Sequence, residues 1–227
     1  QAKRRPTATL LPPAYPVAGR LRLAKRVRHT RCVSFVTHLE CANCGKQFTA
    51  GQPHNLCTDC QRPLWVRYDL DAVKSAFPRE RLAKRPADLW RYRELLPYAD
   101  TANVVSLGET MTPILSTPGL GAELGLGNLL FKDESRLPTG SFKARGMALA
   151  ITMANEFGIR RVACPTAGNA GGAMAAYASR AGMESYVFMP DDTPMINMKE
   201  THLAGATVVR VNGLINDCGR LVAEGRE

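Results

Sequence analysis

A lysine near the start of an expected helix is the first residue in this sequence that could do chemistry. Lys143 lies in the run Pro-Thr-Gly-Ser-Phe-Lys-Ala-Arg-Gly at 138–146, about one turn past a cap that Thr139 or Ser141 would provide. The positive end of a helix dipole disfavours an ammonium, so this lysine would more readily be the neutral nucleophile that a Schiff base requires. A lysine after Gly-Ser is more commonly a solvated side chain, and the order of a nucleotide P-loop is absent. The lysine therefore needs a second site to support it.

A glycine-rich turn at 165–172, Pro-Thr-Ala-Gly-Asn-Ala-Gly-Gly, is that second site. It joins an expected strand to an expected helix, so free backbone N–H groups would meet an anion at the positive end of the helix. Asn169 adds a side-chain amide at the same place. A plain tight turn between strand and helix is the simpler interpretation. A dinucleotide fingerprint is disfavoured because Ala170 stands where that motif needs glycine.

Four cysteines form two Cys-x-x-Cys knuckles, with twelve residues between Cys44 and Cys57. Gly45 permits the positive φ that such a turn needs. Four thiolates give closed tetrahedral zinc coordination, which is structural rather than catalytic. In so short a segment the metal would supply the folding energy. The predicted ligands are Cys41, Cys44, Cys57 and Cys60.

Two other interpretations of the knuckles stay open: a pair of disulfides, which the lack of secretory features disfavours, and a decayed site that binds nothing. His38 and His54 flank the module, and we expect them to be surface side chains rather than ligands. The sequence shows no apolar run long enough for a membrane span and no secretory signal, so we expect a cytoplasmic protein.

Short apolar strands alternate with helices in the second half of the chain. We expect strands at 129–132, 161–165, 185–189 and 207–211, with helices at 141–157, 170–181, 193–203 and 214–227 between and after them. This alternation predicts an α/β fold with a parallel sheet and flanking helices. The expected domains are a tail at 1–38, a zinc ribbon at 39–68, connecting helices and the start of the catalytic domain at 69–118, and an α/β core at 119–227.

The net charge of +10 is concentrated at the N-terminus, where nine of the 30 basic residues lie between Lys3 and Arg31, ahead of the first acidic residue, Glu40. We expect residues 1–38 to be disordered and to contribute little to the fold, although such a tail could be a transit peptide or an anion-binding arm. The chain opens on Gln1 and ends in a helix with no closing signal. We therefore expect it to be an N-terminal fragment of a longer protein.

Taken together, the motifs resemble a known family. Ser-Leu-Gly-Glu-Thr-Met-Thr-Pro-Ile at 106–114, Phe-Lys-Asp-Glu at 131–134, the lysine run at 139–146 and the turn at 166–171 occur in order. This order is similar to that of the tryptophan-synthase-type, or fold type II, family of pyridoxal-phosphate enzymes, and within it to the threonine synthases, which carry an N-terminal ribbon. The resemblance covers residues from about 39 to the end and implies the fold type II sheet, here incomplete.

The resemblance also implies roles. Lys143 would bond to pyridoxal 5'-phosphate and shuttle protons, and Asn169 would donate to the 3-hydroxyl of the cofactor. The reaction would take O-phospho-L-homoserine and water to L-threonine and phosphate, and a homodimer is left open. The substrate carboxylate would be held by the turn residues Thr166, Ala167, Gly168, Asn169 and Ala170.

The sequence departs from the family in two ways. The cradle for the cofactor phosphate and the partner of the pyridine nitrogen should lie beyond residue 227, so we do not expect the chain to be active alone. Ala144 stands where many members carry Asp. A sister lyase, similar to threonine dehydratase or cysteine synthase, stays open as an alternative. A zinc ribbon that binds nucleic acid stays open too, but the ribbon is not notably basic and has no row of stacking aromatics.

Overall fold

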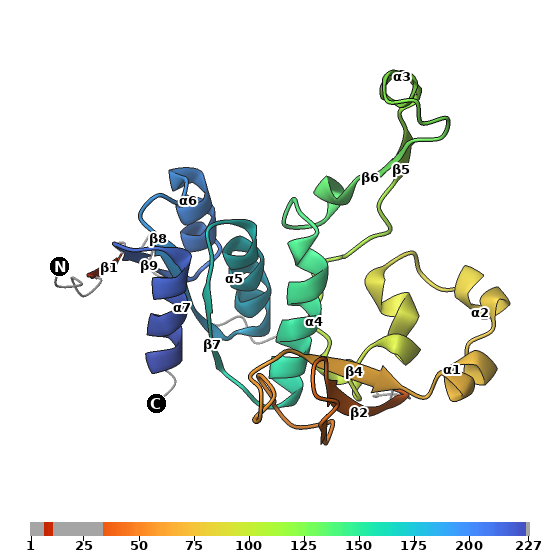
Figure 1. Ribbon diagram of the computed structural model, residues 1–227, viewed down its shortest axis with the longest axis horizontal. Helices are drawn as coiled ribbons and strands as arrows, with labels where there is room; N and C mark the ends of the chain where they lie inside the picture. Colours follow the sequence, from red (N-terminus) through yellow and green to blue (C-terminus); the bar gives the residue numbers. More distant parts are fainter. Residues whose placement is uncertain (1–6, 11–33, 226–227) are drawn as a thin grey trace. The chain divides into compact units, whose positions relative to one another are not determined.

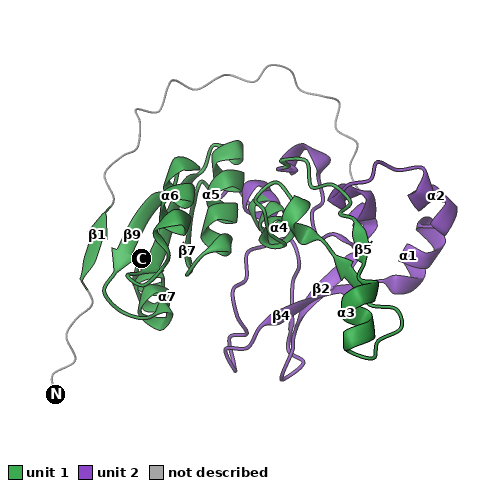
Figure 2. Cartoon of the chain, turned by 90° about the horizontal axis from the view of Figure 1, so that it is seen from above, with its two compact units in different colours: residues 1–19, 106–151, 160–227 green, residues 20–105, 152–159 purple. Residues whose placement is uncertain are grey.

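The computed structural model describes residues 7–10 and 34–225, and these residues fall into two compact units. The first unit takes in the described residues of 1–19, 106–151 and 160–227, and the second takes in those of 20–105 and 152–159 (Figure 2). Helix α4 (Lys143–Glu156) contributes residues to both units. Within the described ranges, no helix is both long and apolar enough to cross a bilayer.

The first unit is built on a four-stranded sheet in the order β1-β9-β8-β7 (Figure 1). Strands β7 (Arg161–Pro165), β8 (Glu184–Pro190) and β9 (Thr207–Val211) run parallel, with Val162 opposite Ser185 and Val187 opposite Val208. This confirms the predicted α/β fold with a parallel sheet. Each predicted strand starts and ends within one or two residues of the observed one.

Helices pack on both faces of this sheet. Helices α5 (Asn169–Ala181) and α6 (Met195–Leu203) pack against each other on one side, and α7 (Ile215–Glu224) lies on the other (Figure 2). Helix α5 ends at Gly182, whose φ of 66° is the left-handed conformation expected after a helix. The core between α7 and the sheet includes Val209, Val211 and Cys218.

The edge strand of the sheet corrects one prediction. Residues Ala8–Leu10 form β1, which pairs antiparallel with β9 so that Thr9 lies opposite Arg210. The sequence predicted no regular structure there. All three residues of β1 are exposed, so its backbone hydrogen bonds to the free edge of β9, rather than apolar burial, hold it in place. At the other end of the predicted tail, residues 36–38 are also ordered, because they begin a strand of the second unit. Residues 1–6 and 11–33 of the tail lie outside the described residues.

A hairpin and two short turns complete the first unit. Strands β5 (Ile114–Ser116) and β6 (Leu130–Lys132) pair antiparallel around α3 (Pro118–Glu123), and their six residues are all exposed. The 3₁₀ turn η3 (Glu134–Arg136) follows β6 and leads into the loop before α4. The predicted strand at 129–132 is therefore present, but it belongs to this hairpin and not to the parallel sheet.

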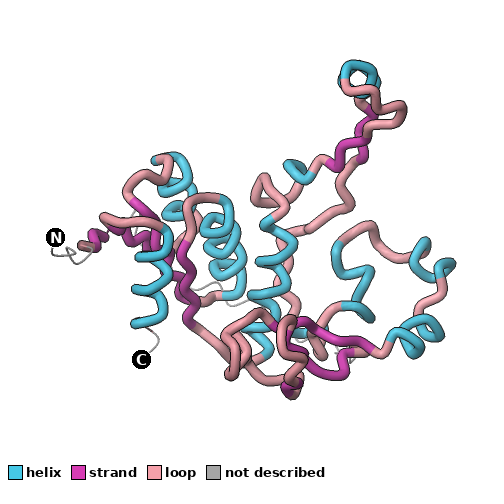
Figure 3. The backbone as a smooth tube through the Cα atoms, in the orientation of Figure 1, coloured by secondary structure: helices cyan, strands magenta, loops and turns pink. Residues whose placement is uncertain are grey.

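The second unit holds a three-stranded antiparallel sheet in the order β3-β2-β4. Figure 3 draws all strands of the chain in magenta. Its strands are β2 (Val36–Cys41), β3 (Gln47–Phe48) and β4 (Leu64–Tyr68). The short helices α1 (Leu70–Ala76), α2 (Arg79–Ala83), η1 (Leu89–Leu95) and η2 (Thr101–Asn103) follow. Asp69 caps α1 by accepting from the N–H of Ala72 at 2.9 Å. Of the expected connecting helices, the one predicted at 70–77 is α1, whereas the one predicted at 86–96 is the 3₁₀ segment η1 and not an α-helix.

Helix α5 can pack closely on the sheet because its third residue is glycine. A Cβ at Gly171 would lie 2.5 Å from Cγ2 of Thr166 and 2.7 Å from Cγ1 of Val187. These contacts are shorter than carbon atoms tolerate, so any side chain here would push α5 away from β8. The close approach in turn places the first residues of α5, and the turn before them, at the carboxyl end of β7.

We predict that Gly171→Ala destabilises the protein by about 1–3 kcal/mol, the range for overpacking a tight core. The matched control is Gly146→Ala in α4, where a Cβ would meet nothing within 4 Å. That change should stabilise by about 0.5–1 kcal/mol, because alanine loses less backbone entropy than glycine in a helix. Urea unfolding of the two variants measures both effects. A Gly171→Ala protein as stable as the unmodified chain would contradict the packing argument.

Candidate active site and metal centre

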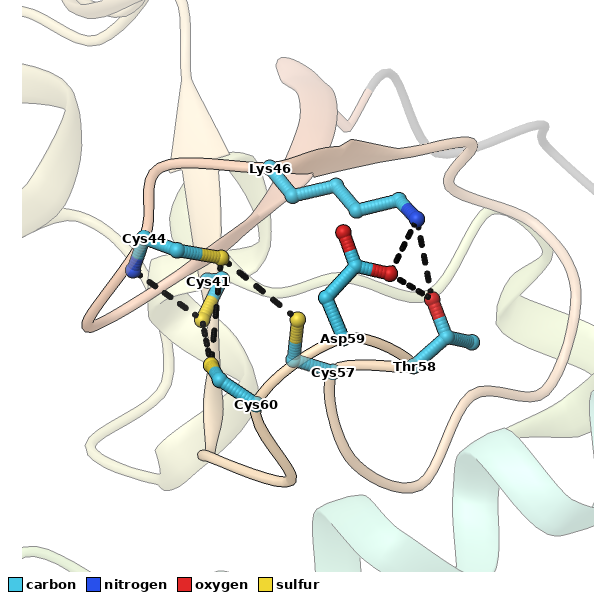
Figure 4. Close-up of polar contacts among 7 residues, drawn as sticks. All are labelled: Cys41, Cys44, Lys46, Cys57, Thr58, Asp59 and Cys60. Carbon is cyan, nitrogen blue, oxygen red and sulfur yellow. Dashed lines mark hydrogen bonds and ion pairs between the residues drawn. The ribbon is translucent and has the colours of Figure 1, made fainter.

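The four predicted cysteine ligands meet at one point in the second unit (Figure 4). Their Sγ atoms all lie within 4.8 Å of one another. Cys41 and Cys60 approach to 3.4 Å, Cys44 and Cys57 to 3.6 Å, and Cys60 and Cys44 to 3.8 Å. Zinc–sulfur bonds of about 2.3 Å in a tetrahedron give sulfur–sulfur edges of about 3.8 Å. The donor set and its spacing therefore fit a zinc ion.

Tight backbone turns at the two knuckles hold the sulfurs in place. The N–H groups of Asn43 and Cys44 donate to Sγ of Cys41, and the Cys44 N–H is the main reason that the pKa of Cys41 falls to about 6. Gly45 has the predicted positive φ, at 73°. The second knuckle reaches the same conformation at Gln61, with φ of 54°, which nothing in the sequence indicated.

The two knuckles are also joined by a polar contact beside the sulfurs. Nζ of Lys46 donates to Oδ1 of Asp59 at 2.6 Å and to Oγ1 of Thr58 at 3.0 Å (Figure 4). Neither histidine joins the ligand group found among the described residues. His38 lies 3.7 Å from Glu40, and His54 hydrogen-bonds the carbonyl of Thr49.

In the first unit, the candidate lysine is the first residue of helix α4. The loop before it turns at Gly140, with φ of 65°, and Nζ of Lys143 lies 4.1 Å from the centre of the Phe142 ring. Oγ of Ser141 and Oγ1 of Thr139 are buried and have no hydrogen-bond partner. Buried hydroxyls are normally satisfied, so these two are candidate partners for a polar group bound at the start of α4.

The turn at 166–170 is preorganised by its own hydrogen bonds. Thr166 is buried, its backbone N–H donates to the carbonyl of Phe188 at 3.0 Å, and its Oγ1 accepts from the N–H of Gly168 at 3.1 Å. Asn169 is exposed and starts α5. Within the described part of the chain, three backbone N–H groups at this helix start have no acceptor: those of Ala167, Asn169 and Ala170.

Such a turn can bind an anion, because unpaired N–H groups and the helix dipole both favour negative charge. Lys143 and this turn lie in the same unit, but no hydrogen bond or ion pair among the described residues joins them. Their joint action on one ligand therefore stays a prediction.

A fully buried carboxylate that sequence reasoning did not single out lies inside the motif at 106–114. Glu109 is 0% exposed and accepts from Oγ of Ser106 at 2.7 Å, from the N–H of Leu107 at 2.8 Å and from the hydroxyl of Tyr177 on α5. Burial alone would raise the pKa of Glu109, but these donors lower it below its ordinary value. Burial and the adjacent carboxylate raise the pKa of Tyr177. The motif is thus attached to the helix that carries Asn169.

A second carboxylate, Glu134, binds the start of α4. Nε and Nη2 of Arg145 donate to its two oxygens at 2.6 and 3.0 Å, and the hydroxyl of Thr112 donates to Oε1. These contacts, led by the Arg145 guanidinium, lower the pKa of Glu134 from 4.5 to about 2. Glu134 and Arg145 stand inside the recognised motifs, so the signal was present, but only the partnership in space gives them a role.

Comparison with known proteins shows which proteins this chain is similar to. A sequence profile described as "Pyridoxal-phosphate dependent enzyme" matches residues 105–227, more than half of the chain. The threonine synthase of Methanocaldococcus jannaschii is 36% identical over 185 residues, which make up 81% of this chain and 45% of that protein. The threonine synthase of Methanosarcina acetivorans is 32% identical over 186 residues, again 45% of that protein. The chain thus spans less than half the length of these curated relatives.

A solved structure supports the fold alone. The crystal structure of Escherichia coli diaminopropionate ammonia lyase in complex with D-serine aligns with a TM-score of 0.50 at 22% identity, covering 55% of this chain and 38% of that one. The residues present offer polar groups to an oxygen-rich cofactor or substrate, while the cradle for a cofactor phosphate is not among them. A helix-start lysine, two buried hydroxyls without partners and a turn with free N–H groups are the donors that such a molecule needs.

We predict that the chain binds close to one equivalent of zinc through the four cysteines. Cys44→Ser should lower bound zinc below half an equivalent, because a closed tetrahedral site loses most of its affinity with one thiolate. The control is Cys164→Ser, a cysteine on β7 outside the cluster, which should leave zinc unchanged. Metal analysis after gel filtration makes the measurement. Less than half an equivalent in the unmodified chain would remove the zinc assignment.

We predict that the Glu134–Arg145 ion pair makes stability fall in acid. The folded pKa of Glu134 is lowered to about 2, so its contribution is complete above the ordinary value of 4.5 and is lost as pH falls from there toward 2. Glu134→Gln should therefore be less stable than the unmodified chain at neutral pH, and the difference should shrink below about pH 4. Urea midpoints of both proteins across this pH range give the measurement. A difference that stays constant with pH would contradict the ionised pair.

Proposed function

The chain belongs to the family of pyridoxal-phosphate dependent enzymes, and on this basis we propose that it is the lysine-bearing part of a threonine synthase. The proposed reaction converts O-phospho-L-homoserine and water to L-threonine and phosphate. We further propose a cytoplasmic location, in keeping with a biosynthetic enzyme.

One observation favours a threonine synthase over other members of the family. The match to the Methanocaldococcus jannaschii threonine synthase covers 185 residues, more than the family region at 105–227 can supply. The similarity must therefore extend into the residues before 105, where the cysteine cluster lies. A sister lyase that shared only the catalytic fold would not account for similarity in that unit.

We assign the central chemical role to Lys143. Lys143 is the first residue of α4, and the buried hydroxyls without partners, those of Thr139 and Ser141, precede it by four and two residues. In the proposed mechanism Lys143 carries the cofactor and moves a proton at the α-carbon of the substrate. Pyridoxal phosphate, when bound, supplies the electron sink that stabilises negative charge at that carbon.

The turn before α5 has the complementary role of binding and orientation. We propose that its free N–H groups, at Ala167, Asn169 and Ala170, hold the substrate α-carboxylate and that the side-chain amide of Asn169 orients the cofactor ring. Thr166 and Gly168 keep the turn in shape through their mutual hydrogen bonds. The zinc ribbon, in this proposal, stabilises its own unit and takes no part in the reaction.

The departure at Ala144 has a structural counterpart. This residue is 0% exposed and shares the buried face of α4 with Ala148 and Ile151. A carboxylate at this position would be buried. The chain therefore has an apolar contact where many relatives have a charge, and we propose that this changes the packing of α4 and leaves the reaction type as it is.

We expect the 227-residue chain to bind pyridoxal phosphate weakly or not at all, because the cradle for the cofactor phosphate is not among its residues. In a full-length protein that carries this chain, we predict that borohydride reduction after incubation with pyridoxal phosphate leaves the cofactor on Lys143. Lys143→Ala should abolish this trapping, because no other lysine among the described residues is the first residue of a helix. Lys199→Ala, at an exposed lysine on α6, should leave the trapping intact. Peptide mapping by mass spectrometry locates the modified residue. Trapping on Lys132 or Lys199 in place of Lys143 would show that the site is misassigned, and no trapping at all would count against the enzyme.

Product analysis separates the proposal from the sister lyases. Threonine and phosphate released from O-phosphohomoserine would support threonine synthase activity. Conversion of free threonine or serine, with phosphohomoserine left untouched, would favour a lyase similar to threonine dehydratase or cysteine synthase.

A further inference from the structure

The start of α4 is intrinsically loose, although it carries the candidate lysine. Gly140 precedes it in a left-handed conformation, and Gly146 lies in its first full turn with nothing within 4 Å of where a Cβ would stand. Glycine within a helix costs about 0.5–1 kcal/mol relative to alanine, so this turn tends to fray. Something outside the helix must hold the turn if Lys143 is to keep a fixed position.

The ion pair between Arg145 and Glu134 provides that hold. Both guanidinium contacts, at 2.6 and 3.0 Å, reach the same carboxylate, which gives the pair a defined orientation as well as attraction. The side chains are only 30% and 23% exposed, so solvent screens them less than a surface pair. Thr112 donates its hydroxyl to the same carboxylate.

Two other contacts anchor the partner segments. Nζ of Lys132 donates to the carbonyl of Thr112 at 2.5 Å, which links both ends of the β5–β6 hairpin. Nη2 of Arg145 also lies 3.4 Å from the hydroxyl of Thr112. The start of α4 is thus tied to two segments that come 33 and 11 residues earlier in the chain.

The positions of Arg145 and Lys143 around the helix axis determine how the ion pair acts on the lysine. Residues advance by about 100° each, so Arg145 and Lys143 lie about 160° apart on opposite flanks of the helix. Ala144, between them, is 0% exposed and faces the protein interior. Anchoring the Arg145 flank therefore fixes the rotation of the first turn, and with it the flank that presents Lys143.

We propose that Glu134 and Arg145 are positioning residues that fix the lysine-bearing turn of α4 for bond formation between Lys143 and pyridoxal phosphate. This inference rests on the proposed function, because it takes Lys143 as the lysine that bonds to the cofactor. Neither residue touches the reacting atoms in this role. Their effect passes through the backbone of the first helical turn.

The test compares Glu134→Gln, which keeps the size of the side chain, with the unmodified sequence, both in a full-length protein that carries this chain. Two measurements are made: amide hydrogen exchange at residues 143–147, without cofactor, and the extent of borohydride trapping of pyridoxal phosphate on Lys143 relative to Lys199. Glu134→Gln should speed exchange in the first turn and lower the trapping ratio about tenfold, the factor expected for one lost charge-assisted hydrogen bond. Arg145→Lys keeps the charge but not the two-pronged contact, so it should lower the ratio less.

The matched control is Glu184→Gln, which removes a different ion pair of the same unit. Arg161 and Glu184 lie 2.8 Å apart, and their side chains are 76% and 56% exposed, so solvent screens this ion pair. This variant should leave the trapping ratio and the exchange of α4 unchanged.

The possible outcomes test the positioning role of Glu134 and Arg145 separately from the proposed function. Faster exchange with an unchanged trapping ratio would make the pair merely structural and would overturn the inference, as would equal losses at Lys143 and Lys199. Either result leaves the lysine assignment standing. Failure to trap the cofactor on Lys143 in the unmodified full-length protein would instead overturn the proposed function itself.

Discussion

The carboxylate of Glu134 is the point on which the candidate active site depends. It receives two donors from Arg145 and one from Thr112, and so joins three stretches of the first unit that are separated in the chain. A partly buried ionised carboxylate needs several donors to offset its lost hydration, and here they come from two different segments. The carboxylate thus ties the first turn of α4 to the segment that carries Thr112.

Glu109 is a second carboxylate that several donors hold in place, and it is linked to helix α5. It is fully buried and charged, and its donors come from Ser106, Leu107 and Tyr177. Because Tyr177 belongs to α5, this carboxylate secures the helix whose first residues belong to the proposed anion-binding turn. The two glutamates are therefore structural parts of the site: one holds the lysine helix and the other holds the turn helix. The chemistry itself belongs to other residues.

The second unit, which contains the four cysteines, is stabilised in a different way from the first. Its strands are short, with two residues in β3, and many of its side chains are half-buried or exposed. A small unit of this kind buries too little apolar surface to offset the entropy of its loops. The convergence of four sulfurs and the Lys46–Asp59 bridge between the knuckles take the place of a core. The parallel-sheet unit, by contrast, relies on apolar packing such as that around Gly171.

The sequence by itself determined the strand–helix alternation, the four-cysteine cluster and the family, because these depend on local periodicity, ligand spacing and ordered motifs. It could not determine that residues 8–10 would pair with β9, since an edge strand held by backbone hydrogen bonds leaves no side-chain pattern. It also could not pair Glu134 with Arg145 or Glu109 with Tyr177. A charged residue in a sequence does not show which donors will surround it, and only the tertiary structure, by bringing distant segments together, decides that.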